Sequence, residues 1–503
     1  MKLSYKLITL ALAFGAACGW SLAEERLSTD QLRDLVEQGE TGYMATYATR
    51  LLFGDGTEAD IKLGRELMEK AAAANKPDGK YGLGLCYYYG FGAFDLSQTY
   101  NYMLGASEAG YKPAFNSLGH CYEEGLGVAS NYHQARRCFF QSSGDLDSQC
   151  MAVKLLDYRR TPFAVNPREV GQNINQALAM FGNAEQVAMT PTVYEFLYNA
   201  QEQSRSAIAK KLAHKSGNKK RLSAAELYNW GRLYELALAT NAVSEKDGTR
   251  QMWEYYKDSA QRKFVPAQIA IARLQARSRD EQGLASLKAY SETGYWQAKQ
   301  ALLELYETQE APKMLSGDDY TALLQELRQK GYHGASTKLA EYYASTAKDS
   351  AKAWQYTLAA ADDGEAIGCY KAAEFYRTGK DAGAGVTVKP DPEKAYAYLH
   401  TLCRDLPRAD YQRLDMCRAF TNLGNMYYYG KGCPQDTNQA EEWYNVALNT
   451  RGGEKLEANY RLGSLYIEKT DKRQLGAEML RGVAASSSEY AKSARYLLTK
   501  HKL

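Results

Sequence analysis

The chain repeats a short glycine-bearing pattern, and this repetition constrains the fold more than any other feature. Residues 79–92 read GKYGLGLCYYYGFG, and residues 114–127, offset by 35 positions, read AFNSLGHCYEEGLG. The pattern returns in residues 423–432 as LGNMYYYGKG. A self-similar period of this length is typical of supersecondary units that stack side by side. A single ordinary core is therefore not expected for these 503 residues.

Each copy carries the signals of two helices joined by a turn. In the copy near the C-terminus, Gly424 falls inside the first helix. Glycine costs a helix up to about 1 kcal/mol relative to alanine, so we expect close approach of a second helix there. Gly430 and Gly432 end the first helix, because glycine adopts the left-handed conformation without a Cβ penalty. Asp436 then caps the second helix, and the small Ala440 lets the two helices cross closely.

This pattern resembles the Sel1-like repeat, a relative of the tetratricopeptide repeat with a longer turn. The resemblance covers residues 79–145, 334–402 and 420–448. It implies an all-α fold, an α-solenoid in which antiparallel helix pairs stack into a right-handed superhelix. It also implies the usual role of the family, which is to act as an adaptor in multiprotein complexes.

The pattern divides the chain into four predicted parts. These are a signal peptide in residues 1–23, N-terminal Sel1-like repeats in 24–154, an irregular helical connector in 155–222, and C-terminal Sel1-like repeats in 223–503. The connector fits the repeat worst, because three proline dipeptides interrupt it: Thr161-Pro162, Asn166-Pro167 and Thr190-Pro191.

The first 23 residues predict export. Two lysines precede an apolar or small run over residues 7–18, and the SLA tripeptide at residues 21–23 offers small residues for cleavage. The run is shorter than the roughly 20 residues of a permanent anchor. A lipid anchor on Cys18 is the alternative, although Gly15 stands where the usual lipobox has leucine.

Charge gives no broad drive toward nucleic acid or anionic membrane. Removal of residues 1–23 takes away two lysines and no acids, which lowers the formal net charge from +3 to +1. No later stretch is long and apolar enough for an integral membrane span. The expected partner is therefore a protein or peptide of unknown identity.

The sequence predicts no catalytic, cofactor-binding or metal site. The segment from Gly424 to Gly432 differs from a P-loop, because five residues separate its first two glycines and no Ser or Thr follows the lysine. His120, Cys121 and His133 share one repeat, but solvated histidines beside a core cysteine explain them better than a metal site. Nucleophile motifs are also lacking, so we expect no enzyme and no cofactor.

The cysteines allow disulfide predictions, because an even number remains after the predicted cleavage and export leads to an oxidising compartment. Cys403 and Cys417 are the leading pair, since they lie near the end of one unit and the start of the next. Cys138 has two possible partners, Cys121 across its hairpin and Cys150 across the following turn. Free buried thiols are the alternative for all of them.

Tyrosines are the best candidates for contact with a partner. Four of them go beyond the repeat pattern: Tyr88, Tyr89, Tyr428 and Tyr429. Their counterparts in the 114–127 copy are Glu123 and Glu124, and a position that is polar in one repeat and aromatic in another is often exposed. Exposed tyrosine offers large contact area at low entropy cost. Ordinary packing against the next turn is an equally weighted alternative.

Together these features predict a non-enzymatic, exported repeat scaffold, periplasmic or secreted, that mediates protein–protein interaction in the bacterial cell envelope. A module that binds peptidoglycan or another glycan, with tyrosines stacked on sugar faces, is the alternative. A hydrolase with its site in the irregular residues 155–222 is a third hypothesis.

Overall fold

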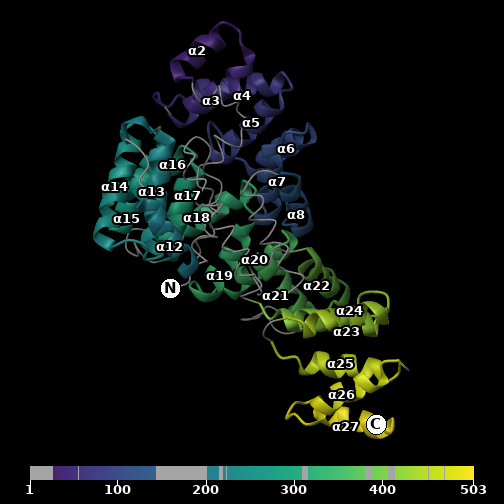
Figure 1. Cartoon of the computed structure of the whole chain (residues 1–503). Helices are drawn as coiled ribbons and strands as arrows, with labels where there is room; N and C mark the ends of the chain where they lie inside the picture. Colours follow the sequence, from purple (N-terminus) through teal and green to yellow (C-terminus); the bar gives the residue numbers. More distant parts are fainter. Residues whose placement is uncertain are drawn as a thin grey trace. The chain divides into compact units, whose positions relative to one another are not determined.

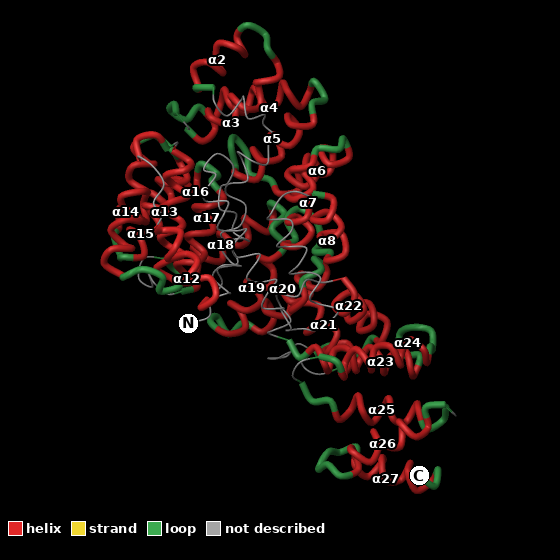
Figure 2. Tube along the Cα trace, viewed as in Figure 1, coloured by secondary structure: helices red, strands yellow, loops and turns green. Residues whose placement is uncertain are grey.

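The computed structural model describes residues 27–54, 56–142, 201–213, 219–222, 224–308, 315–379, 387–405, 414–450, 453–469 and 471–503. Over these ranges the regular elements are helices, and no strand forms (Figures 1 and 2). The predicted all-α class is confirmed. The predicted signal peptide and most of the predicted connector lie outside the described residues. Within the described ranges, no helix has the length and apolarity that a membrane crossing requires.

The chain divides into two compact units. Of the described residues, unit 1 contains those up to Val128, those from Gln134 to Ser142 and those from Gln201 to Tyr332, and unit 2 contains Ala129–His133 and those from His333 to Leu503. The division between the units thus falls inside the stretch that the sequence assigns to a single set of C-terminal repeats.

Consecutive helices pair as antiparallel hairpins, and the second helix of most pairs also packs on the first helix of the next pair. Unit 1 begins with α2 (Thr29–Glu37). Its hairpins are α3 (Met44–Phe53) with α4 (Ile61–Ala73), α5 (Pro77–Tyr89) with α6 (Leu96–Glu108), α7 (Lys112–Glu124) with α8 (Tyr132–Gln141), α13 (Ala224–Ala239) with α14 (Glu245–Gln261), α15 (Val265–Arg277) with α16 (Glu281–Glu292), and α17 (Trp296–Glu307) with α18 (Gly317–Gln329). Helix α12 (Gln201–Ala213) precedes α13.

Unit 2 continues the same architecture. Its hairpins are α19 (Gly334–Ser345) with α20 (Ser350–Asp362), α21 (Ala366–Thr378) with α22 (Pro392–Asp405), α23 (Met416–Tyr429) with α24 (Thr437–Leu448), and α25 (Leu456–Tyr466) with α26 (Arg473–Ala484). Helix α27 (Ala491–Lys500) ends the stack by packing on α26.

The glycine inside the first helix receives an aromatic ring from the second helix, as its position predicts. A Cβ atom on Gly424 would lie 2.6 Å from the Tyr444 ring, and one on Gly119 would lie 2.6 Å from the Phe139 ring. Real Cβ atoms do not approach neighbours this closely, so glycine is required for the observed helix spacing. The predicted close approach is confirmed.

The turn between the helices also follows the sequence signals. Gly430 and Gly432 have φ values of 62° and 79°, in the left-handed region that favours glycine. The Asp436 carboxylate then accepts hydrogen bonds from the backbone N–H groups of Asn438 and Gln439 at 2.9 and 3.0 Å. These contacts end α23 and start α24 at the predicted positions.

Tyrosine recurs because its ring packs between the two helices of a hairpin. Tyr376 of α21 stacks on Tyr398 of α22, with ring centroids 6.1 Å apart. Lys394, three residues after the capping Asp391, places its Nζ 5.2 Å from the Tyr376 ring. The segment Asp391-x-x-Lys394-Ala395-x-x-Tyr398 thus supplies a cap, a cation and a stacking ring in about two helical turns.

Within unit 1, the repeats of α3–α8 pack laterally against the repeats of α13–α18 through their turns. The Leu96 N–H donates to the Lys330 carbonyl oxygen at 2.8 Å, and the Gly127 N–H donates to the Gly331 carbonyl oxygen at 2.9 Å. In the turn between α5 and α6, a Cβ atom on Gly90 would overlap the carbonyl of Gly294. The turn glycines therefore serve a second role, since they let two sets of repeats make backbone contact.

Candidate functional site

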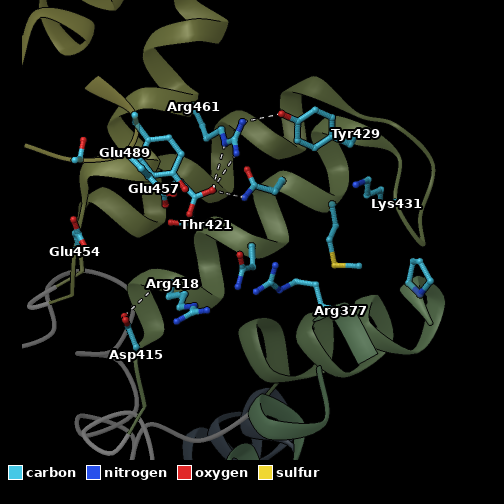
Figure 3. Close-up of a pocket in the computed structure, with 16 residues that line it drawn as sticks. Arg377, Asp415, Arg418, Thr421, Tyr429, Lys431, Glu454, Glu457, Arg461 and Glu489 are labelled. Atoms are coloured by element: carbon cyan, nitrogen blue, oxygen red, sulfur yellow. Dashed lines mark hydrogen bonds and ion pairs between the residues drawn. The ribbon is translucent and has the colours of Figure 1, made fainter. Parts of the chain in front are cut away.

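A groove of about 840 Å³ follows the first helices of unit 2, from α21 across α23 and α25 to the start of α27 (Figure 3). We call it the inner groove. Four of the α23 residues that line it lie at positions i, i+4, i+7 and i+11, which is one face of a helix: Arg418, Asn422, Asn425 and Tyr429. The groove therefore arises from the stacking of successive hairpins and not from a single loop.

Side-chain hydrogen bonds join each first helix to the next across the floor of the groove. The Glu374 carboxylate of α21 accepts from Asn422 Nδ2 at 2.8 Å and from Arg418 at 3.2 Å. On the other side of α23, Asn425 Nδ2 donates to Glu457 of α25 at 3.0 Å. Asn422 and Asn425 are three residues apart on α23, so the first contacts α21 and the second contacts α25.

Arg461 of α25 lies at the centre of the aromatic part of the groove. Its Nη1 donates to the Tyr429 hydroxyl at 2.7 Å, and its Nε and Nη2 lie 3.4 and 3.3 Å from Glu457 Oε1. The guanidinium carbon is 5.7 Å from the Tyr429 ring centroid and 5.8 Å from that of Tyr490. Burial and the nearby charge of Glu457 raise the pKa of Tyr490, so its hydroxyl stays protonated at neutral pH.

The two edges of the inner groove carry opposite charge. Asp415, Glu454 and Glu489 lie at or just before the N-terminal ends of α23, α25 and α27, and we call them the acidic edge. Arg377, in the last turn of α21, and Lys431, just after the end of α23, form the basic edge. Figure 3 shows the two edges on opposite sides of the groove.

Helix direction explains this separation of charge. The first helices of successive hairpins run parallel, so their N-termini gather along one edge and their C-termini along the other. Acidic side chains near helix N-termini and basic side chains near C-termini also complement the helix dipole. The groove is thus lined by charged, amide and hydroxyl groups suited to bind a polar polypeptide by ion pairs and hydrogen bonds.

The four tyrosines predicted to contact a partner lie in two different environments. Tyr429 is 48% exposed and lines the inner groove, and the half-buried Tyr428 packs against it edge to face at 4.9 Å. Their role in binding stays a prediction. For Tyr88 and Tyr89 the expected exposure is wrong, because they are 1% and 0% exposed.

The burial of Tyr88 and Tyr89 results from the lateral packing within unit 1. Tyr88 lies edge-on to Trp296 of α17, at 6.2 Å between centroids, and Tyr89 stacks on Phe91. Phe91 in turn meets Tyr295. Trp296 and Tyr295 lie about 200 positions later in the chain, so no local pattern predicts these contacts.

The predicted Cys403–Cys417 disulfide is not formed in the structure, where both residues are free thiols. They belong to the same buried apolar cluster, and burial raises the pKa of each thiol. Their pairing under oxidising conditions stays a prediction. Cys121 and Cys138 are likewise buried free thiols, and Cys150 lies outside the described residues.

His120 is buried and not solvated, contrary to expectation. It is 3% exposed, its ring packs on Phe139 at 5.0 Å, and its Nδ1 lies 3.5 Å from the Glu123 carboxylate. In the part of the chain that the structure describes, His120, Glu123 and Glu124 are the residues whose ligand atoms lie close enough together to hold a metal ion. All three come from about one turn of α7, and the Glu123 carboxylate is already the polar neighbour of the buried His120 ring.

Unit 1 contains a buried ionic network on the corresponding first helices. Glu235 of α13 pairs with Arg273 of α15, lies 3.7 Å from Arg232, and accepts a hydrogen bond from Tyr256 at 2.8 Å. Burial alone would raise the pKa of Glu235, but the charges of Arg273 and Arg232 lower it to about 2. Glu235 therefore stays ionised, and the network reaches a third hairpin because Arg273 also lies 3.8 Å from Glu304 of α17.

Sequence reasoning missed Arg418, Asn422, Asn425 and Arg461. A usable signal exists, because the residue that follows the small residue of the first helix is polar in several repeats: Arg232, Arg273, Glu374 and Asn425. Arg273, Glu374 and Asn425 take part in the links between first helices described above, and Arg232 lies beside Glu235 within α13. A comparison of that position between repeats would have located both the ionic network and the inner groove.

The stacked hairpins and the groove along their first helices define a helical-repeat protein of the α-solenoid class. Five segments match the family model of the Sel1 repeat: residues 44–76, 77–111, 116–143, 366–404 and 421–449. The chain carries Sel1 repeats in these five segments, as its sequence pattern indicates.

Two solved structures are similar to this chain over most of its length. One is a protective antigen of uropathogenic Escherichia coli strains with an SLR fold, at 19% identity and a TM-score of 0.30, covering 94% of this chain and 97% of that one. The other is a Sel1 repeat protein from Oxalobacter formigenes, at 16% identity and a TM-score of 0.31, covering 79% of this chain and 89% of that one. No curated protein matches the chain in sequence.

Proposed function

We propose that this protein is an exported, non-enzymatic scaffold of the bacterial cell envelope that binds a protein partner in the inner groove. The Sel1 repeat is generally a scaffold for protein–protein interaction. The observation that carries the proposal is the inner groove itself, in which the exposed Tyr429 lies among charged side chains from four successive first helices.

The arrangement of the floor favours recognition. Asn422, Asn425 and Arg461 are fixed by hydrogen bonds to carboxylates and hydroxyls, so the groove keeps its shape without a partner. A rigid surface loses little conformational entropy on binding. Large aromatic and arginine side chains in such a surface are the residue types that dominate binding energy at interfaces.

Affinity capture from envelope extract with the full-length chain tests the proposal. Charge reversal of two exposed groove residues, Arg418→Glu and Lys431→Glu, should remove the captured partner. Charge reversal of exposed Arg481 on α26 is the matched control, and it should leave capture unchanged. Equal capture by all three proteins would contradict a role for the groove.

Export is part of the proposal and has its own test. The basic start and apolar run of residues 1–23 support it. Cell fractionation should place the protein in the periplasm or the medium, with cleavage after Ala23. Retention in the cytoplasm with the full N-terminus intact would contradict export.

Glycan binding is the second candidate, favoured by an apolar hollow of about 540 Å³ on the surface of unit 1. Trp253 lines this hollow together with Ile271 and the charged Arg250 and Lys257. A flat ring bordered by polar groups can stack on a sugar face. Co-sedimentation with purified peptidoglycan, lost on Trp253→Ala and kept in the charge-reversed groove protein, would favour this candidate.

A further inference from the structure

The functional groups on the floor of the inner groove already have partners, and so do two residues of its edges: Arg377 pairs with Glu374 at 3.0 Å, and the Asp415 carboxylate caps α23 by accepting from the Arg418 N–H. Asn425 donates to Glu457 and accepts from the Tyr444 hydroxyl at 2.9 Å, so both atoms of its amide are engaged. Within the described part of the chain, Glu454, Glu489 and Lys431 form no ion pair, and all three are exposed. New ion pairs with a ligand can therefore form at the edges.

We propose that the inner groove binds an extended polypeptide segment in which basic and acidic side chains alternate. This inference deepens the proposed function and depends on it. The segment crosses the first helices and runs between the two edges. In an extended chain, successive side chains point to opposite sides. Alternation then directs every basic side chain to the acidic edge and every acidic side chain to the basic edge.

The length of the groove sets the length of the segment. Neighbouring helices pack at interaxial distances of about 8–10 Å, so the three intervals from α21 to α27 span roughly 24–30 Å. An extended chain advances about 3.3 Å per residue, so about seven to nine residues fill the groove. Such a segment offers about four side chains to each edge.

Fluorescence anisotropy with labelled synthetic peptides of about nine residues tests the charge rule on the full-length protein. The probes are an alternating Lys–Glu peptide, a peptide of the same composition with all lysines before all glutamates, an all-Lys peptide and an all-Glu peptide. The alternating peptide should bind at least about tenfold more tightly than the other three. Its affinity should fall with added salt, because the edge charges are exposed. Equal binding of the alternating and the blocked peptide, or no binding of either, overturns the proposal.

Variants of the edges give a second, sharper readout. Glu454→Lys with Glu489→Lys should weaken the alternating peptide about tenfold, whereas exposed Glu442→Lys on α24 should not. Addition of Arg377→Glu and Lys431→Glu to the first pair exchanges the charges of the two edges except at Asp415, which caps α23 and is left unchanged. The alternating peptide should then bind again, because a shift of one residue moves every side chain to the opposite face. Failure of this rescue, with the fold confirmed by circular dichroism, overturns the proposal.

The charge rule and the scaffold function can be refuted separately. If the native partner is lost from the Arg418→Glu, Lys431→Glu protein but alternating peptides show no preference, the charge rule fails and the scaffold function survives. If the alternating peptide binds as described but capture of the native partner ignores the groove, the scaffold function as proposed fails. The peptide measurement and the capture measurement therefore report separately.

Discussion

The ring of Tyr444 fills the space beside Gly424, where a Cβ atom would lie 2.6 Å from Tyr444 Cε1. The Gly424→Ala substitution should therefore destabilise the protein, because moving the ring out of a packed core costs about 1–3 kcal/mol. Alanine's higher helix propensity, about 1 kcal/mol, works in the opposite direction and limits the net loss of stability to at most about 2 kcal/mol. Thermal and urea denaturation followed by circular dichroism measure the change.

Gly482 provides the matched control for this prediction. It lies in α26, and a Cβ atom there would meet nothing within 4 Å. Gly482→Ala should stabilise the protein by about 0.4–1 kcal/mol. Opposite signs at the two glycines would support the role of Gly424 as a slot for Tyr444, and equal stabilisation at both would refute it.

Trp296 connects the two sets of repeats in unit 1, and its removal should loosen them. It is 1% exposed, stacks on Phe94 at 5.5 Å and lies edge-on to Tyr88 and Tyr332. Trp296→Ala should cost about 3–5 kcal/mol, as for other large core truncations. Hydrogen exchange should rise in α5 and α6. Trp253 is partly exposed, so Trp253→Ala should change the free energy of unfolding and the hydrogen exchange of α5 and α6 less than Trp296→Ala does. Similar effects of both substitutions would argue against the lateral packing.

The sequence was sufficient to predict the hairpin, because its determinants lie within one repeat. Gly430 and Asp436 act within one or two helical turns, Gly424 meets Tyr444 of the same hairpin, and all three have the predicted roles. The lateral packing of unit 1 was not predictable in this way. Its contacts, such as Leu96 with Lys330, join residues more than 200 positions apart, and the turn glycines involved already had a local explanation.

The candidate site was predicted only in part, for a related reason. Tyr429 was identified as an aromatic residue in excess of the repeat pattern. Asn422 and Asn425 were not, since their partners Glu374 and Glu457 belong to neighbouring hairpins. The residues that determine the hairpin fold make their contacts within one repeat, whereas the groove depends on residues that link one repeat to the next.

The ionic network around Glu235 should make unit 1 sensitive to acid. The pKa of the Glu235 carboxyl falls from an ordinary value of 4.5 to about 2 in the folded state. A carboxyl with a depressed folded pKa stabilises the fold above pH 4.5, and this contribution, about 3 kcal/mol, is lost as the pH falls toward 2. Urea denaturation at a series of pH values should show that loss.

The Glu235→Gln substitution isolates this effect. At pH 7 it should destabilise the protein by about 3 kcal/mol, because Arg273 loses its closest carboxylate in a buried site, and the difference from wild type should shrink near pH 2. Asp30→Asn, at an exposed ion pair with Arg33, should cost about 0.5 kcal/mol or less at any pH. A pH-independent deficit for Glu235→Gln would contradict the assignment.

The cysteines should differ widely in reactivity. Burial raises the pKa of the Cys86 thiol to about 12, so almost no thiolate exists at pH 8 and the sulfur is inaccessible. Cys433 is only half-buried. Alkylation of the reduced, native protein followed by peptide mass spectrometry should label Cys433 first and Cys86 only after unfolding. Labelling of Cys86 at the rate of Cys433 would show that α5 opens far more readily than its packing indicates.

Site-specific photo-crosslinking in the producing cell is the most direct test of the claim that partners bind along the first helices of unit 2. A photoreactive amino acid in place of Tyr429, which is 48% exposed in the inner groove, is compared with one in place of Val446, which is 41% exposed on α24. The proposed scaffold predicts a discrete protein adduct from position 429 and none from position 446. Adducts of equal yield at both positions, or at neither, would contradict it.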